Sequence, residues 1–433
     1  MRIKINKWIA CPAIGLLIAI GTDNSIMTYL AALLAAACIL LYDEEDSLCV
    51  LFFSVSFTHA FKSSPSSTSF FIMLLLLYVL WHLSFVRKLH KVVGWIICLT
   101  GYVAVIHLAN LNMGIELVQL IKFAMNLLFL YVAVQHVNYD QPRNLFLFYI
   151  FGVLMASLLK YSDIFPNLSL YTDGRVDIYR FTGMHEDPNY YGVNLVICLC
   201  LVVVMYHRQD ISISILLVMT GLLIWFAALT VSKMVFLMLS MPILAFIYSN
   251  HLKRRYGLQV LSTIILAVVV SLVVSDKIEI FHSVLQRFEE ASDAASLTTG
   301  RAAEWREYIT YILNTPKVLI LGAGLDAPSP ANANDIPHNT YIDYIYNLGI
   351  VGTIGWGYCV GKIFKISNRY IKRNLINAST FVSIMIMWMA LSELLYFDMI
   401  FHILLAYIVW NLSMDNDSGD KKRRLTGEKA FNS

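Results

Sequence analysis

The sequence predicts an all-α protein, a polytopic transmembrane helix bundle with about 12 to 14 spans. Composition is the first reason, because the 433 residues are 58% hydrophobic and 14% charged, whereas soluble domains are about half apolar and a quarter charged. The mean hydropathy of +0.66 is the second reason. The third is the recurrence of apolar runs close to the length of about 20 residues that crosses a bilayer as a helix.

These apolar runs give the expected helices in order along the chain. The runs are 8–22, 25–42, 47–61, 68–86, 92–110, 115–134, 144–161, 188–206, 211–229, 232–249, 257–275, 340–366, 377–395 and 397–413. The Lys and Arg residues of the short connections fall on alternate loops and in the C-terminal tail. Because cytoplasmic loops carry an excess of these residues, we expect both termini to face the cytoplasm.

Two longer segments, 162–187 and 276–339, are then expected to face outward. Within the second, the stretch from Arg301 to Leu313 has apolar residues at helical spacing and is followed by Pro316. This pattern predicts an amphipathic helix that lies on the bundle or on the bilayer surface. Residues 1–413 are expected to form one integral membrane domain that includes both outward segments, and residues 414–433 a disordered cytoplasmic tail.

A histidine ends the second outward segment, directly before a glycine-rich apolar run at 349–361. After His338 and Asn339, the residues Thr340 and Asp343 have the spacing of a capping box, which predicts that Thr340 caps the next helix. The amides at such a helix start would favour a phosphate beside His338. A loop histidine that only helps to start a helix explains the same residues. The glycines are expected to let a neighbouring helix approach closely.

Basic residues expected on the outer side are informative because the positive-inside bias works against them. They include Arg175, Arg180, Lys233 and Arg301. Together with His338, these cations could line a site for a pyrophosphate-bearing lipid, since arginine binds phosphate oxygens at two points. Lys233 is equally compatible with a snorkelling anchor at the membrane face.

Two acidic residues, Glu393 and Asp398, are expected at the outer membrane face near this site. The sequence contains no P-loop, Rossmann glycine pattern, His-Glu-x-x-His or Gly-x-Ser-x-Gly motif. No Asp-x-Asp or Asp-Asp pair occurs in an outward segment, so neither a metal nor another cofactor is expected. The net charge of +3 gives no reason to expect a nucleic acid partner. The absence of a P-loop disfavours an ATP-driven pump, and the absence of His-Glu-x-x-His disfavours a zinc protease.

Three parts of the chain share a pattern with one known family. They are Arg180-Phe181-Thr182-Gly183 leading into Asp187-Pro188-Asn189-Tyr190, Thr299-Gly300-Arg301 with Trp305, and His338-Asn339 followed nine residues later by Gly349-Ile350-Val351-Gly352. These segments resemble the O-antigen ligase/O-antigen polymerase superfamily of bacterial polysaccharide assembly. The turn that ends in Lys233 is similar to a family turn that more usually reads Ser-Arg, and lysine keeps the charge but loses the two-point geometry.

The resemblance implies a metal-independent inverting glycosyltransferase of the bacterial inner membrane, with its active site facing the periplasm. Its substrates would be undecaprenyl-pyrophosphate-linked glycans, both as donor and as acceptor. His338 would be the general base, and Arg301, with Lys233 and Arg180, would hold the departing pyrophosphate. The further residues expected to bind substrate are Arg175, Asn339, Asp187, Asn189 and Glu393. An ordinary imidazole titrates at about pH 6.5, which suits a base near neutral pH.

Two members of this superfamily differ in their acceptor. A polymerase transfers growing glycan to another lipid-linked repeat, whereas a ligase transfers finished glycan to lipid A-core. The two outward segments favour the polymerase, because the acidic and aromatic segment 162–187 offers hydrogen bonds and stacking surfaces to a sugar. A chain-length regulator is then a possible partner, in addition to membrane lipid. A transporter of lipid-linked sugars, with Glu116, Lys122 and the outer cations as its pathway, is the alternative outside the superfamily.

Overall fold

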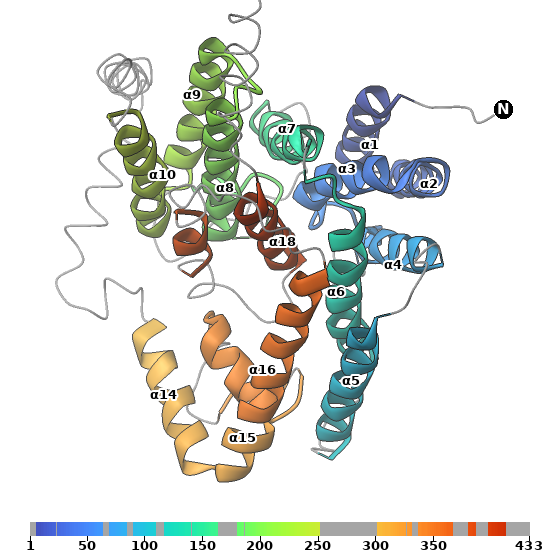
Figure 1. Ribbon diagram of the computed structural model, residues 1–433, viewed down its shortest axis with the longest axis vertical. Coiled ribbons are helices and arrows are strands. Elements are labelled where there is room, and N and C mark those ends of the chain that lie inside the picture. The colour runs from blue at the N-terminus through green and yellow to red at the C-terminus, as the bar shows by residue number, and fades with distance from the viewer. Residues whose placement is uncertain are drawn as a thin grey trace, which may run out of the picture.

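The structure, a computed structural model, describes residues 6–22, 24–63, 69–84, 90–109, 117–139, 141–162, 180–185, 187–251, 301–325, 327–330, 337–366, 380–386 and 397–412. Every regular element in these ranges is a helix (Figure 1), which confirms the predicted all-α class. The expected span 257–275 and most of the expected span 377–395 lie outside the described residues, as does the tail 414–433.

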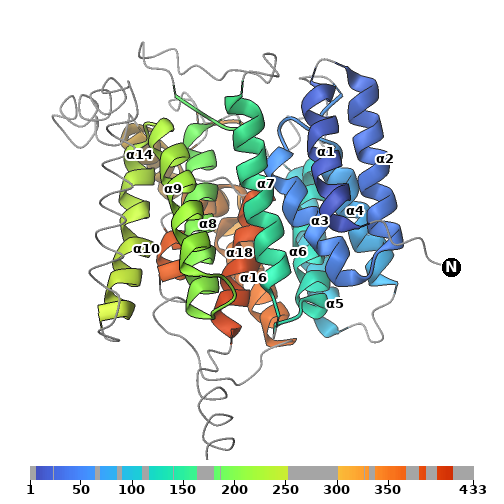
Figure 2. The ribbon, with the colours of Figure 1, turned by 90° about the horizontal axis from the view of Figure 1, so that it is seen from above.

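The helices follow one another with short connections in the first half of the chain. They are α1 (Lys7–Gly21), α2 (Ser25–Leu41), α3 (Glu44–Ser54), the 3-10 turn η1 (Val55–Phe57), α4 (Phe70–Leu83), α5 (Lys91–Ala109), α6 (Leu117–His136), α7 (Arg143–Tyr161), α8 (Pro188–His207), α9 (Ile213–Leu229), α10 (Lys233–His251), α14 (Arg301–Asn314), α15 (Pro316–Leu321), α16 (Thr340–Ile366) and α18 (Phe397–Asn411). Figure 2 shows α1, α2 and α7 to α10 running roughly parallel to one another, as in a membrane bundle.

Within the described residues, four helical stretches are long and apolar enough to cross a membrane. They are Lys91–Ala109, Val118–His136, Arg143–Tyr161 and Pro188–His207. Shorter apolar stretches are Lys7–Gly21, Ser25–Leu41, Phe70–Leu83, Ile213–Leu229, Lys233–Leu244 and Met399–Asn411. The chain is thus an integral membrane protein by its helices, while the expected count of spans depends partly on residues outside the described ranges and stays a prediction.

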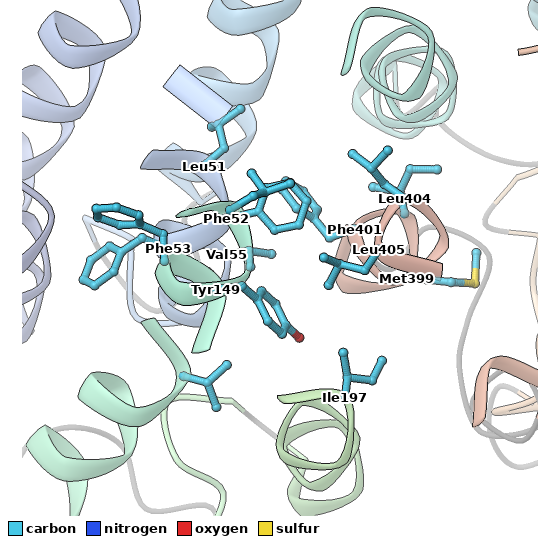
Figure 3. Packing of buried hydrophobic residues seen from close by; sticks show 14 of the residues in the cluster. Leu51, Phe52, Phe53, Val55, Tyr149, Ile197, Met399, Phe401, Leu404 and Leu405 are labelled. Carbon is cyan, nitrogen blue, oxygen red and sulfur yellow. The ribbon is translucent and has the colours of Figure 1, made fainter. Parts of the chain in front are cut away.

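The core of the bundle lies where α3, α7, α8 and α18 meet (Figure 3). Phe401 of α18 packs edge-on against Phe52 of α3, with ring centroids 4.9 Å apart, and stacks on Phe129 of α6 at 4.8 Å. These rings are fully buried. Because lipid tails are as apolar as these side chains, close packing and polar contacts hold such a core together.

The expected helix 47–61 is wrong at both of its ends. Helix α3 begins at Glu44, because the side chain of Asp43 accepts a hydrogen bond from the amide of Asp46 (2.9 Å) and three acidic residues occupy the first turn. It ends at Ser54, where the 3-10 turn begins. At 1.5 Å per residue the helix is about 16 Å long, short of a bilayer core of about 30 Å. Hydropathy alone missed the polar start.

The amphipathic helix expected after Arg301 is present as α14, and its apolar side packs on the bundle. Tyr308 and Ile312 are buried against Tyr346 of α16, and the rings of Tyr308 and Tyr346 lie 4.9 Å apart. Pro316 does more than end this helix, because it is the first residue of the short helix α15. Figure 1 shows α14 and α15 forming a hairpin beside α16.

Helix α16 is broken at a glycine. Gly349 has φ 65° and ψ 178°, a conformation almost restricted to glycine. The end of α15 fills the break, where an added Cβ on Gly349 would overlap the carbonyl oxygen of Ile320 and the amide nitrogen of Gly322. The amide of Ala323 donates to the carbonyl of Tyr346 across the same junction (2.7 Å). The break therefore joins the hairpin of α14 and α15 to the helix that follows His338.

The other glycines of α16 divide into two groups. A Cβ added to Gly352 would lie 3.0 Å from the ring of Tyr102, and a Cβ added to Gly355 would lie 3.0 Å from a methyl group of Leu99. The expected close packing is therefore found at these two glycines. At Gly357 and Gly361, no described atom lies within 4 Å of an added Cβ. For these two glycines, the expectation of a closely packed neighbour is wrong among the described residues.

Candidate active site

Arg180 joins the loop before α8 to the turn between α9 and α10. Its Nε donates to the carbonyl of Thr230 (3.1 Å) and its Nη2 to Oδ1 of Asn189 (3.2 Å). The same Asn189 oxygen accepts a hydrogen bond from the hydroxyl of Ser232 (2.7 Å). Arg180 is only 7% exposed, so its charge is fixed in place by these bonds. Three segments that the sequence separates by up to fifty residues therefore meet at one amide side chain.

The turn at 230–232 places Lys233 at the start of α10. Val231 is buried at φ 47°, which is a rare conformation for a β-branched residue. The hydroxyl of Ser232 accepts from the amide of Val235 (3.4 Å) and so caps the helix. Lys233 is partly buried in the first turn. Strained turns of this kind persist where the surrounding contacts hold them, and they cluster at functional sites.

The start of α8 is fixed by Asp187. Its Oδ1 accepts from the amides of Asn189 (2.6 Å) and Tyr190 (3.4 Å), and Pro188 occupies the first helical position. This is the usual arrangement of an N-cap followed by proline. The structure thus gives Asp187 a capping role, and its contact with substrate stays a prediction.

His338 lies beside the start of α8, although 148 residues separate it in sequence from its partner there. The hydroxyl of Tyr190 is 3.4 Å from Nδ1 of His338. Tyr190 is 6% exposed and His338 is partly buried, so the imidazole borders the bundle without being enclosed by it. The backbone of His338 has φ 43°, in the left-handed region that only a few per cent of non-glycine residues adopt.

Asn339, and not Thr340, caps the helix that follows His338. Its Oδ1 accepts from the amides of Tyr341 (3.1 Å) and Ile342 (3.3 Å). Thr340 is fully buried and faces the sulfur of Met399 (3.9 Å), so the expected capping box is wrong by one residue. Asparagine is at least as good a cap as threonine, which explains the shift. Whether Asn339 also binds substrate stays a prediction.

The hairpin of α14 and α15 contacts the residue directly before this histidine. The indole Nε1 of Trp305 in α14 donates to the carbonyl of Pro337 (2.7 Å), directly before His338. Arg301 lies one turn earlier on the same helix, and residues four apart share a helix face. Arg301 therefore belongs to the face of α14 that meets the histidine loop.

Most of the predicted site residues are thus linked by contacts, and two lie beyond what can be described. Arg175 and Glu393 are outside the described residues. Sequence reasoning gave no role to Tyr190 or Trp305, although both side chains reach the loop of His338. Aromatic residues at helix starts also suit the membrane interface, so nothing local distinguished them. Their presence in the segments shared with the superfamily was the one available signal.

The electrostatics of this corner favour an anion. The starts of α8, α10 and α16 are connected through Asn189, Ser232 and the contact between Tyr190 and His338. Helix starts carry a positive dipole end, and Lys233 adds a full charge. Among the described residues, no cluster of three or more His, Cys, Asp and Glu side chains is placed to hold a metal ion.

Comparison with known proteins matches residues 215–357 to the family described as O-Antigen ligase. The match covers about a third of the chain, including the turn before Lys233, Arg301, His338 and the first glycines of α16. No curated protein and no solved structure matches the chain. The family match therefore confirms the resemblance to the O-antigen ligase/O-antigen polymerase superfamily.

Proposed function

We propose that this protein polymerises undecaprenyl-pyrophosphate-linked oligosaccharide repeats on the periplasmic side of the inner membrane, in the assembly of O-antigen or a related surface polysaccharide. The family match supports the broader activity, that of a membrane glycosyltransferase-like ligase or polymerase. The observation that carries the proposal is the contact of Tyr190 with His338, because it joins a partly buried imidazole to the turns that hold Arg180 and Lys233.

In the proposed reaction, His338 acts as the general base. It removes the proton from an acceptor hydroxyl while that oxygen forms a bond to the anomeric carbon of the donor. The bond from the anomeric carbon to the pyrophosphate oxygen breaks, and the pyrophosphate leaves with the electron pair. Attack from the side opposite to the leaving group inverts the anomeric centre. General base catalysis of this kind contributes about 10²- to 10⁴-fold in rate.

The outer cations stabilise the charge that develops on the pyrophosphate. Arg301 is the strongest candidate for a two-point contact, because guanidinium groups match phosphate geometry. Lys233 adds a point charge at the start of α10. Two nitrogens of Arg180 already bond to protein groups, so this residue contributes its fixed charge and holds the turn beside Lys233. Such fixed charges stabilise a transition state most where water is excluded.

The ligase is the second candidate, because the matched family is described by that activity. A polymerase and a ligase differ in the product that accumulates when the gene is deleted. Loss of a polymerase leaves single repeats attached to the core, whereas loss of a ligase leaves long lipid-linked chains and a bare core. Gel electrophoresis of the surface glycan from a deletion strain distinguishes them, and the single-repeat pattern is the expected result.

Purified protein tests the class of activity. In detergent, with lipid-linked repeats as donor and acceptor and without ATP, we expect longer lipid-linked chains and released undecaprenyl pyrophosphate. The same protein in vesicles provides the comparison with a transporter. Movement of lipid-linked repeats across the bilayer without elongation would contradict the proposal.

A further inference from the structure

We propose that Tyr190 is a positioning residue for the base: its hydroxyl oxygen accepts a hydrogen bond from Nδ1–H of His338 and thereby leaves Nε2 to receive the acceptor's proton. This inference rests on the proposed function of His338. It starts from the 3.4 Å separation between the Tyr190 hydroxyl and Nδ1. Hydrogen bonds of catalytic groups are often long before substrate binds and shorten in the reacting complex.

Tyr190 is suited to this role because both of its backbone groups have side-chain partners. Its amide donates to Asp187 (3.4 Å), and its carbonyl accepts from Nδ2 of Asn194 (3.3 Å). Oδ1 of Asn194 accepts from the hydroxyl of Tyr149 (2.6 Å) and lies 2.7 Å from Nε2 of His402. Figure 3 shows the Tyr149 hydroxyl directed toward the space between α8 and α18. The phenol that faces His338 therefore extends from a helix start that side-chain hydrogen bonds hold on both sides.

The histidine is held from its own side as well. The carbonyl of Pro337 before it accepts from Trp305, and Asn339 after it caps α16. Between these two anchors, His338 has φ 43°. A left-handed residue of this kind is fixed by its surroundings, so the direction of its Cα–Cβ bond is set by the backbone.

The direction of the hydrogen bond determines whether the histidine can act as a base. A neutral imidazole carries one proton, so one nitrogen donates and the other accepts. If Tyr190 accepts from Nδ1–H, the lone pair is on Nε2, and the imidazolium formed during reaction keeps the same bond in a stronger, charge-assisted form. If Tyr190 instead donated to Nδ1, the proton would be on Nε2, and Nε2 would not be a base.

Replacement of Tyr190 by phenylalanine separates these two arrangements. In Tyr190→Phe the imidazolium loses its acceptor, so we expect the acid limb of the kcat profile to move to lower pH by about 0.5 unit. We also expect kcat to fall about ten- to a hundredfold, as for other groups that orient a reacting side chain. The assay is elongation of lipid-linked repeats by purified protein between pH 5 and pH 9.

Tyr191→Phe is the matched control. Tyr191 follows Tyr190 on the same helix, is equally buried, and donates its hydroxyl to Oγ of Ser157 (2.6 Å), away from the site. Its loss lowers stability in the same way without changing the environment of His338. We expect the acid limb of Tyr191→Phe to stay where it is, and the unfolding temperature in detergent to report whether each variant is folded.

Three outcomes would overturn the assignment of Tyr190. In the first, the acid limb of Tyr190→Phe moves to higher pH, which indicates the opposite direction of the hydrogen bond. In the second, the acid limb of a folded Tyr190→Phe protein does not move. In the third, Tyr191→Phe shows the same shift as Tyr190→Phe. The proposed function is tested separately by His338→Asn. If that variant is inactive while Tyr190→Phe behaves like wild type, the base assignment stands and only the role of Tyr190 fails. An active His338→Asn protein would contradict both the base assignment of His338 and the role of Tyr190.

Discussion

Helix α8 takes part in two polar clusters about one turn apart, and they are built differently. Around Asn194, the bonds to Tyr149 and His402 measure 2.6 and 2.7 Å, and these residues are between 0% and 2% exposed. At the helix start, the contacts of Asn189 and Tyr190 with Arg180 and His338 measure 3.2 and 3.4 Å. The inner cluster is enclosed in the bundle, whereas the outer one reaches the surface at His338, which is only partly buried.

The backbone differs in the same way. The inner cluster sits on regular helices. The outer one includes two of the three non-glycine residues with positive φ among the described residues, Val231 and His338. Strain of this kind costs about 1–3 kcal/mol per residue and persists where function requires it. We therefore expect the inner cluster to act mainly on stability, and the outer cluster, with its two strained residues, to act mainly on the proposed activity.

The largest expected effect on activity is that of replacing His338. We expect His338→Asn to lose about a thousandfold in turnover, because the base is removed. Asparagine adopts the left-handed region readily, so the backbone at φ 43° is retained. The measurement is elongation of lipid-linked repeats, together with the unfolding temperature in detergent.

His338→Ala provides the control for backbone strain. It removes the same base, but alanine is less tolerant of positive φ. Equal inactivity of both variants, with a lower unfolding temperature for alanine only, is the expected pattern. A strongly active His338→Asn protein would show that the outer cluster has a structural role like that of the inner one.

The next largest effect is on folding, at the break in α16. We expect Gly349→Ala to lower the free energy of unfolding by about 3–4 kcal/mol, because the conformation is nearly restricted to glycine and the added Cβ overlaps Ile320 and Gly322. Gly357→Ala on the same helix has open space and should be neutral or slightly stabilising. Unfolding in detergent measures both. Equal behaviour of the two variants would contradict the assigned break.

A smaller loss is expected when Arg301 is replaced by lysine. Charge is kept but two-point binding of phosphate is not, so we expect turnover to fall about ten- to a hundredfold. Arg306→Lys is the control, because Arg306 is exposed on the same helix. The assay is again elongation of lipid-linked repeats. Undiminished activity of Arg301→Lys would assign this residue a purely electrostatic role.

Hydropathy and charge bias predicted most of the helices, because membrane helices are long apolar runs with a strong compositional signal. They misplaced α3, whose start depends on the cap by Asp43, and missed α15, which is only six residues long. The sequence also did not predict the non-helical backbone conformation at Gly349. A glycine at helical spacing is compatible with both close packing and a positive φ, and the sequence alone does not separate these.

The sequence singled out several candidate site residues but not the aromatic side chains that contact the histidine loop. Arg180, Asn189 and His338 came from charge, topology and resemblance. Tyr190, whose hydroxyl lies 3.4 Å from Nδ1 of His338, is 148 residues away and reads as an ordinary interfacial aromatic. Contacts between distant helices depend on how the bundle packs, and no local pattern reports them.

The smallest expected effect completes the comparison within α8. Tyr149→Phe removes the hydroxyl that bonds to Asn194 (2.6 Å) and contacts His402 (2.8 Å), but keeps the ring that packs against Phe52. We expect the free energy of unfolding to fall by about 1–3 kcal/mol, since a buried partner loses its bond. Turnover and the acid limb of the pH profile should not change, in contrast to Tyr190→Phe. A fall in turnover without a fall in unfolding temperature would show that the inner cluster also acts on the imidazole, because the side chain of Asn194 connects the two clusters through the carbonyl of Tyr190.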